Sequence, residues 1–175
     1  IYNHDEIRDE LKARGRRFHS RSDTEVVLQG FLEWDVQVFE KLRGMFGVGL
    51  WTESKKRLVL ARDRVGIKPL YLFRAGADLY FGSELKAILG LPEIPRRFSR
   101  EGLNAFLSLN YIPAPYTMVD GITKLAPGHW LEWLDGRERS APYWQLRFDP
   151  QPNFNPEAAK EELDHLLRAA VKEHL

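Results

Sequence analysis

The sequence contains no cysteine and no run of about 18 consecutive apolar residues. Without cysteine the chain cannot form disulfide bonds, hold a metal through thiolates or supply a thiol nucleophile. Without a long apolar run it offers no candidate transmembrane helix, and its polar, acidic first residues do not resemble a signal peptide. These absences fit a cytoplasmic protein, and we expect no membrane partner.

The sequence also lacks an excess of charge of either sign. Its 26 lysines and arginines against 25 aspartates and glutamates give a formal net charge of +1. Such a balance produces no large electrostatic field, so we expect no nucleic-acid partner. Hydrophobic residues make up 43% of a chain of 175 residues, which excludes global disorder and suits one domain or slightly more.

The first third of the chain changes from helical to strand periodicity at Gly44. Before it, apolar spacing predicts helices at residues 3–14, 22–34 and 36–42. We expect Asn3 to cap the first helix, and Ser22 with Glu25 to form a capping box at the second. After Gly44, alternating apolar residues predict two antiparallel hairpins, of residues 46–51 with 58–63 and 69–73 with 79–81.

The chain as a whole predicts an α+β fold, with helices segregated from antiparallel strands. We expect helices at residues 83–89 and 99–107 and strands at 129–134 and 140–144. Pro150, Pro152 and Pro156 mark residues 148–155 as a linker, after which Asn155 would cap a last helix over residues 156–175. Because nothing before the linker requires that helix, we interpret it as the start of a following domain.

Few residues outside one motif suggest a binding site. No glycine-rich phosphate loop is present, and the five histidines lack the spacing of metal ligands. The basic residues between Arg14 and Arg21 have acidic neighbours and are interpreted as a solvated helix end. Arg62, Asp63, Arg64 and Lys68 are interpreted as a structural salt-bridge network rather than a ligand site.

The phrase Ser22-Asp23-Thr24-Glu25 admits two interpretations. A capping box and an acidic residue at a helix N-terminus account for all four residues. Alternatively, Asp23 is a binding residue, a conclusion that spacing alone does not require.

Several phrases together resemble the glutamine-hydrolysing asparagine synthetases of the bacterial long form. The run at residues 61–71 is long and specific, and the run at 111–129 distinguishes this family from other class II glutamine amidotransferases. The phrases, in order, are Ile1-Tyr2-Asn3, Ser22-Asp23-Thr24-Glu25, Gly44-Met45-Phe46, Ala61-Arg62-Asp63-Arg64-Val65-Gly66-Ile67-Lys68-Pro69-Leu70-Tyr71, Gly82-Ser83-Glu84-Leu85-Lys86-Ala87, Tyr111-Ile112-Pro113-Ala114-Pro115, and Gly121-Ile122 through Lys124-Leu125-Ala126-Pro127-Gly128-His129.

The resemblance implies two domains and a ligase reaction. A glutaminase domain of the N-terminal-nucleophile (Ntn) hydrolase type, with αββα layers, releases ammonia from glutamine. An α/β ATP-pyrophosphatase domain, using ATP and Mg²⁺, activates aspartate, and ammonia displaces AMP to give asparagine. On this basis residues 1–147 are part of the glutaminase domain, and residues 156–175 begin the synthetase domain.

The resemblance assigns one site residue, Asp23, as the acid that binds the α-amino group of glutamine. The family's nucleophile is an N-terminal cysteine whose own amine acts as base. This sequence has no cysteine, so no catalytic residue is assigned. The expected partners are glutamine, aspartate and ATP, with none of the cofactors bound by this segment. We therefore expect an excised fragment that is inactive by itself.

Two alternatives stay open beside the asparagine synthetase. The first is a related ligase that amidates another carboxylic acid, because no residue of this segment contacts the acceptor in the family plan. The second is a non-catalytic protein that kept the fold and lost the nucleophile. The sequence does not give the oligomeric state, and it leaves a homodimer open.

Overall fold

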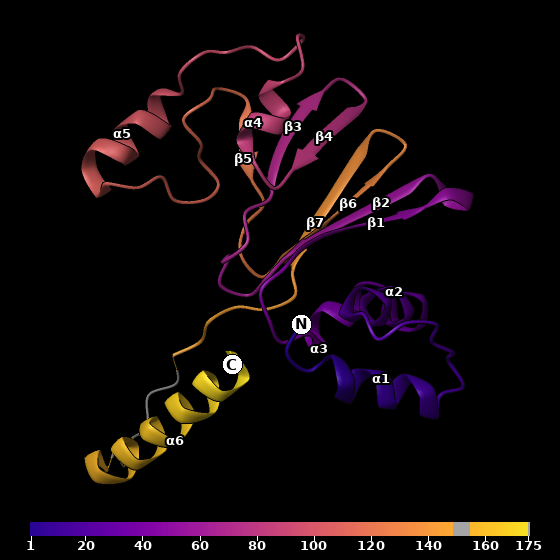
Figure 1. The fold of residues 1–175 in the computed structure, drawn as a ribbon. Helices are drawn as coiled ribbons and strands as arrows, with labels where there is room; N and C mark the ends of the chain where they lie inside the picture. The colour runs from indigo at the N-terminus through magenta and orange to yellow at the C-terminus, as the bar shows by residue number, and fades with distance from the viewer. Residues whose placement is uncertain (149–154, 175) are drawn as a thin grey trace. The chain divides into compact units, whose positions relative to one another are not determined.

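The computed structural model describes residues 1–148 and 155–174, which fall into two units. One unit comprises Ile1 and Asn3–Gln145, and the other comprises Tyr2 and Leu146–Leu175. Figure 1 shows the elements of both units, each of which is considered by itself. No helix among the described residues is long and apolar enough to span a membrane.

The larger unit contains a four-stranded and a three-stranded antiparallel sheet (Figure 1). The first sheet has the order β1-β2-β6-β7, built from Gly47–Thr52, Arg57–Arg62, His129–Leu134 and Arg137–Pro142. The second has the order β4-β3-β5, built from Asp78–Gly82, Tyr71–Ala75 and Ile122–Lys124. Both predicted hairpins are confirmed, whereas the short strand β5 was not predicted. Asp135 and Gly136 form the turn between β6 and β7, both with the positive φ of a tight hairpin.

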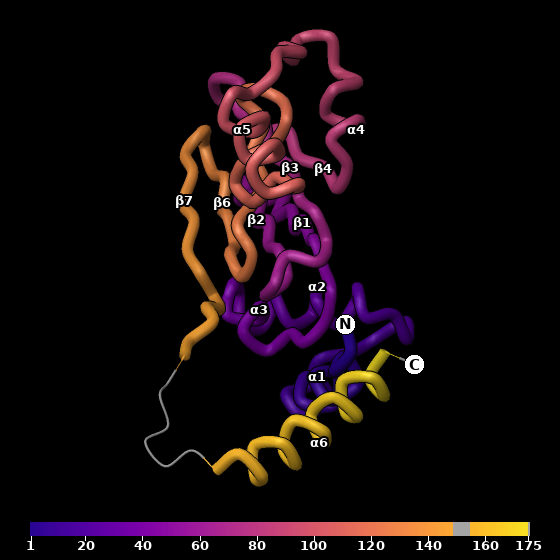
Figure 2. Tube along the Cα trace, turned by 90° about the vertical axis from the view of Figure 1, so that its left-hand side faces the viewer, coloured from indigo at the N-terminus to yellow at the C-terminus, as the bar shows by residue number. Residues whose placement is uncertain are grey.

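Helices α1, α2 and α3 cover one face of the four-stranded sheet, and the three-stranded sheet lies on its other face (Figures 1 and 2). These helices span His4–Ala13, Asp23–Trp34 and Val38–Lys41. Along β2, Val59 and Ala61 pack into the core beneath the helices, while Leu60 packs toward the second sheet with Leu72.

The second sheet carries a helix on its outer face, which completes an αββα order of layers. Helix α4, Leu85–Leu89, places Ile88 against Ile122 of β5 and beside Tyr71 and Phe73 of β3. The predicted αββα arrangement is thus present in the larger unit. Helix α4 begins at Leu85, two residues later than the predicted helix over residues 83–89, because the backbone of Glu84 is still extended.

Two predicted helix caps at the N-terminal end are wrong in detail. Asn3 precedes α1, but its amide does not cap it. It donates to the carbonyl of Lys41 at 2.9 Å and accepts from the amide of Arg43 at 2.8 Å. The Ser22 hydroxyl accepts from the Thr24 amide at 3.1 Å, whereas the Glu25 carboxylate turns back to the preceding loop. The reciprocal capping box therefore does not form.

Two further helices, α5 and α6, begin as predicted, but their apolar residues are mostly exposed. Helix α5, Arg100–Leu109, is capped by Ser99, whose hydroxyl accepts from the Gly102 amide at 3.0 Å. Its apolar residues Leu103, Phe106 and Leu107 are exposed. In the smaller unit, α6 spans Pro156–His174 and is capped by Asn155. Most of the predicted linker, residues 149–154 of 148–155, lies outside the described residues.

The predicted salt-bridge network around Arg62 is wrong, because the side chains of Arg62 and Asp63 form hydrogen bonds with backbone groups and not with each other. The Arg62 guanidinium donates to the carbonyls of Gly66, Lys68 and Leu125 at 2.6–2.8 Å. The fully buried Asp63 carboxylate accepts from the amides of Ile67 and Lys68 at 2.8 and 2.9 Å. Backbone groups far from the regular ladders are satisfied in this way, which fixes the loop between β2 and β3.

Candidate functional site

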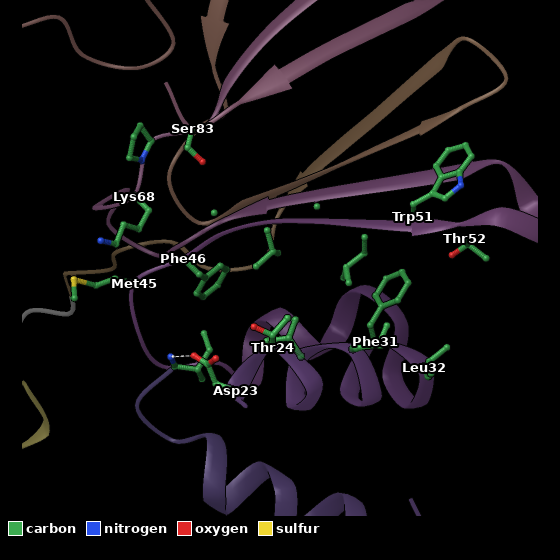
Figure 3. Close-up of a pocket in the computed structure, with 18 of the residues that line it drawn as sticks. Asp23, Thr24, Phe31, Leu32, Met45, Phe46, Trp51, Thr52, Lys68 and Ser83 are labelled. Atoms are coloured by element: carbon green, nitrogen blue, oxygen red, sulfur yellow. Dashed lines mark hydrogen bonds and ion pairs between the residues drawn. The ribbon is translucent and has the colours of Figure 1, made fainter. Parts of the chain in front are cut away.

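A pocket of about 1070 Å³ lies between α2 and β1. Its floor and walls are mostly apolar and include Val27 and Phe31 of α2 and Val48 and Leu50 of β1. Figure 3 shows the α2 side chains directed toward the strand, with Asp23 near one end of the helix. Concave apolar sites with a few polar groups are the usual form of small-molecule pockets.

Asp23 is the acidic group at this end of the pocket. It is the first residue of α2, and its side chain is 43% exposed. One carboxylate oxygen accepts a hydrogen bond from the α-amino group of Ile1 at 2.8 Å (Figure 3). That bond lowers the pKa of Asp23, an effect that partial burial opposes and the charge of the same amino group reinforces. The carboxylate is ionised at neutral pH and lines this end of the pocket with part of its surface exposed.

The loop before Asp23 is fixed by the Glu25 carboxylate. That carboxylate accepts from the amides of His19 and Ser20 at 2.8 and 2.7 Å and from the Ser20 hydroxyl at 2.6 Å. These hydrogen bonds lower the pKa of Glu25 to about 2. The predicted capping box would have Glu25 accept from the amide of Ser22. Its carboxylate instead binds the amides of His19 and Ser20, which lie earlier in the loop.

Lys68 lines the pocket on the side of the β2–β3 loop (Figure 3). Its backbone amide is bound by Asp63 and its carbonyl by Arg62. Its exposed ammonium group forms no hydrogen bond or ion pair with the part of the chain that the structure describes. The site thus combines a fixed carboxylate and a free cation with apolar walls.

This arrangement suits binding of a small molecule that carries an ammonium group, but it contains no thiol nucleophile. The described residues also form no cluster of three or more histidine, aspartate or glutamate side chains able to hold a metal ion. Of the sequence predictions, Asp23 lies in the pocket, and its role toward glutamine stays a prediction. The buried Arg8, which contacts the loop before Asp23, was not among the residues that the sequence analysis singled out.

The αββα layers agree with the family to which the sequence belongs. Residues 1–144 match the family described as glutamine amidotransferase domain. The chain is therefore a member of that family, a class II glutamine amidotransferase domain related to asparagine synthetases.

Particular relatives include the glutamine-hydrolysing asparagine synthetase 3 of Bacillus subtilis, 37% identical over 83% of this chain and 24% of the relative. The amidase chyE of Penicillium rubens is 28% identical over 92% of this chain and 23% of its own length. The chain thus spans about a quarter of the length of these curated relatives.

Among solved structures, the glutamine phosphoribosylpyrophosphate amidotransferase from B. subtilis, complexed with ADP and GMP, shares the fold. Its TM-score is 0.53 at 22% identity, over 83% of this chain and 28% of that one. The likeness supports the fold alone, an α+β Ntn-like glutamine amidotransferase domain.

Proposed function

We propose that the chain is part of a glutamine-hydrolysing asparagine synthetase. In the complete enzyme, ammonia released from glutamine would be transferred to aspartate activated by ATP. The products would be asparagine, glutamate, AMP and pyrophosphate. Residues 1–147 would contribute to the glutamine site, and residues 156–175 would begin the domain that activates aspartate.

The observation that carries the proposal is the ionised carboxylate of Asp23 at the end of an apolar pocket. This carboxylate is 43% exposed and lines the pocket, so it can accept a hydrogen bond from the α-ammonium group that glutamine presents. A charge-assisted hydrogen bond of this kind gives both affinity and orientation. The methylene groups of the glutamine side chain would then lie against apolar walls such as Val27 and Phe31.

The chain's own residues would bind and orient glutamine, not attack its amide. Hydrolysis in the family needs the thiol of an N-terminal cysteine, and these 175 residues have none. ATP and Mg²⁺ would supply acceptor activation in the domain that residues 156–175 would begin. We therefore expect the purified segment to release no ammonia from glutamine.

The test is steady-state kinetics of the full-length product of the gene that encodes this chain. Wild type should form asparagine from glutamine, aspartate and ATP. Asp23→Asn should raise the KM for glutamine about tenfold or more, because a charged hydrogen bond is lost. Activity with free ammonia in place of glutamine should be unchanged. Asp9→Asn is the matched control, because Asp9 is exposed on α1 and pairs only at 3.6 Å with Lys12.

A second candidate is a ligase that amidates a different carboxylic acid. The observation in its favour is the similarity to a fungal amidase whose name does not mention asparagine. Glutamine hydrolysis without asparagine formation, and with another acid as acceptor, would select this candidate. No glutamine hydrolysis by the full-length product would instead indicate a non-catalytic relative and would contradict both proposals.

A further inference from the structure

Arg8 is a buried cation on the apolar face of α1. Its side chain lies on the same side of the helix as Ile7 and Leu11, which are core residues, and the residue is 7% exposed. A buried guanidinium is costly unless its donors are satisfied. The groups that satisfy Arg8 therefore show what it holds in place.

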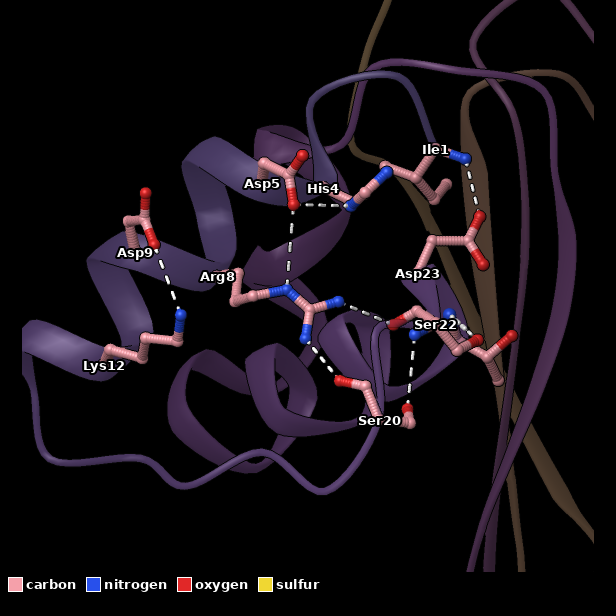
Figure 4. Close-up of polar contacts among 10 residues, drawn as sticks. Ile1, His4, Asp5, Arg8, Asp9, Lys12, Ser20, Ser22 and Asp23 are labelled. Atoms are coloured by element: carbon pink, nitrogen blue, oxygen red, sulfur yellow. Dashed lines mark hydrogen bonds and ion pairs between the residues drawn. The ribbon is translucent and has the colours of Figure 1, made fainter.

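The guanidinium of Arg8 binds the loop that precedes Asp23 (Figure 4). One terminal nitrogen donates to the carbonyl of Ser20 at 2.7 Å, and the other donates to the carbonyl of Ser22 at 3.1 Å. The third nitrogen lies 3.8 Å from the Asp5 carboxylate, and the ring of Phe18 lies 4.9 Å below the guanidinium carbon. The planar fork of arginine suits two carbonyls at once, whereas an ammonium group acts as a point charge.

The same loop is held from its other side by Glu25. That carboxylate binds the amides of His19 and Ser20, while Arg8 binds the carbonyls of Ser20 and Ser22. Both the donors and the acceptors of the loop are therefore tied to helices. Ser22 is the N-cap of α2, and Asp23 follows it directly, so the fixed Ser22 carbonyl sets the direction in which Asp23 enters the pocket.

We propose that Arg8 is a positioning residue for Asp23 in the binding of the substrate's α-ammonium group. The inference rests on the proposed function, in which Asp23 binds glutamine. Arg8 does not line the pocket, so it acts through the Ser20–Ser22 carbonyls and not by contact with substrate. Loss of its two hydrogen bonds frees the loop, and the Asp23 carboxylate no longer has one fixed orientation. Binding of the ammonium weakens, while the reacting amide is unaffected.

The test compares two substrates in the full-length product of the gene. One is L-glutamine, and the other is 4-carbamoylbutanoate, which has the same amide and chain but no α-amino group. The variants are Arg8→Met, which removes both hydrogen bonds, and Arg8→Lys, which keeps the charge and stem. Lys12→Met is the matched control, because Lys12 lies one turn along α1, is 54% exposed and contacts only Asp9 among the groups of Figure 4.

We expect Arg8→Met to raise the KM for glutamine about tenfold with kcat changed less than about twofold. Its kcat/KM for 4-carbamoylbutanoate should stay within about twofold of wild type, so the preference for glutamine is lost. Arg8→Lys should give an intermediate loss, and it carries the test if the Met variant does not fold. Adding Arg8→Met to Asp23→Asn should cause little further loss, because both act on one interaction.

Three results would overturn the inference, and they are distinguishable from failure of the proposed function. Equal losses on both substrates would mean that Arg8 only supports the fold. Unchanged kinetics of both Arg8 variants would mean that the loop holds Asp23 without it. Additive losses in the double variant would mean that Arg8 acts independently of Asp23. If wild type itself hydrolyses no glutamine, the proposed function fails and this inference fails with it.

Discussion

Asp63 should control the order of the loop that carries Lys68 into the pocket. Its fully buried carboxylate accepts from two backbone amides, Ile67 at 2.8 Å and Lys68 at 2.9 Å. In Asp63→Asn one oxygen becomes an NH₂ group that faces an N–H donor, so one charged hydrogen bond is lost and the other becomes neutral. At about 1.5–3 kcal/mol for a charged bond and about 1 kcal/mol for the weakening, the local cost is about 2.5–4 kcal/mol.

Amide hydrogen exchange of the segment 64–70 measures this cost directly. Since each 1.4 kcal/mol is a factor of ten, exchange at Ile67 and Lys68 should become about 60- to 700-fold faster. Asp78→Asn is the matched control, because Asp78 is exposed at the turn between β3 and β4. Exchange in the variant within about threefold of wild type would refute the reasoning, because the carboxylate would then not be what orders the loop.

Two further predictions concern stability. Gly102→Ala should lower the free energy of unfolding by about 1–3 kcal/mol, and with it the Tm, since a Cβ at this position would lie 1.9 Å from the carbonyl oxygen of Thr117. Gly90→Ala is the control and should leave the Tm nearly unchanged, because its Cβ would meet nothing nearer than 3.4 Å. The lowered pKa of Glu25, about 2 against an ordinary 4.5, means that its ionised form stabilises the fold above about pH 4.5 and loses that effect as pH falls toward 2. The Tm difference between wild type and Glu25→Gln should narrow over that range, and a difference that stayed constant would contradict the assignment.

Much of the larger unit could be predicted because its strands and helices follow simple periodicities. The alternation through β1 and β2 is readable because each strand is buried on one or both faces of a layered core. Strand β5 was missed because it has only three residues, and its pairing with β3 depends on contacts about 50 residues apart. Apolar residues on one helical face did not imply burial for α5, whose Leu107 is 72% exposed.

The polar contacts of the candidate site were harder to predict than its secondary structure. Ser22 and Glu25 have the residue types and spacing of a capping box, yet the carboxylate finds better donors in two successive loop amides. The spacing of Ser22 and Glu25 in the sequence shows that the two residues could interact. Which backbone amides the Glu25 carboxylate binds depends on the path of the preceding loop, which the spacing does not give. Arg8 did leave a signal in the sequence, because it is a charged residue on the same helical face as Ile7 and Leu11.

The two outer strands of the four-stranded sheet differ in a way that limits how copies of the chain can polymerise. Strand β7 presents Arg137, Glu138 and Arg139 and ends at Pro142, features that discourage addition of another strand. Strand β1, from Gly47 to Thr52, carries no charged residue. Among the described residues, β1 is therefore the edge of this sheet that is more open to addition of another strand. Two copies meeting β1 to β1 would saturate each other by two-fold symmetry, so growth by this route ends at a pair instead of continuing into a fibre.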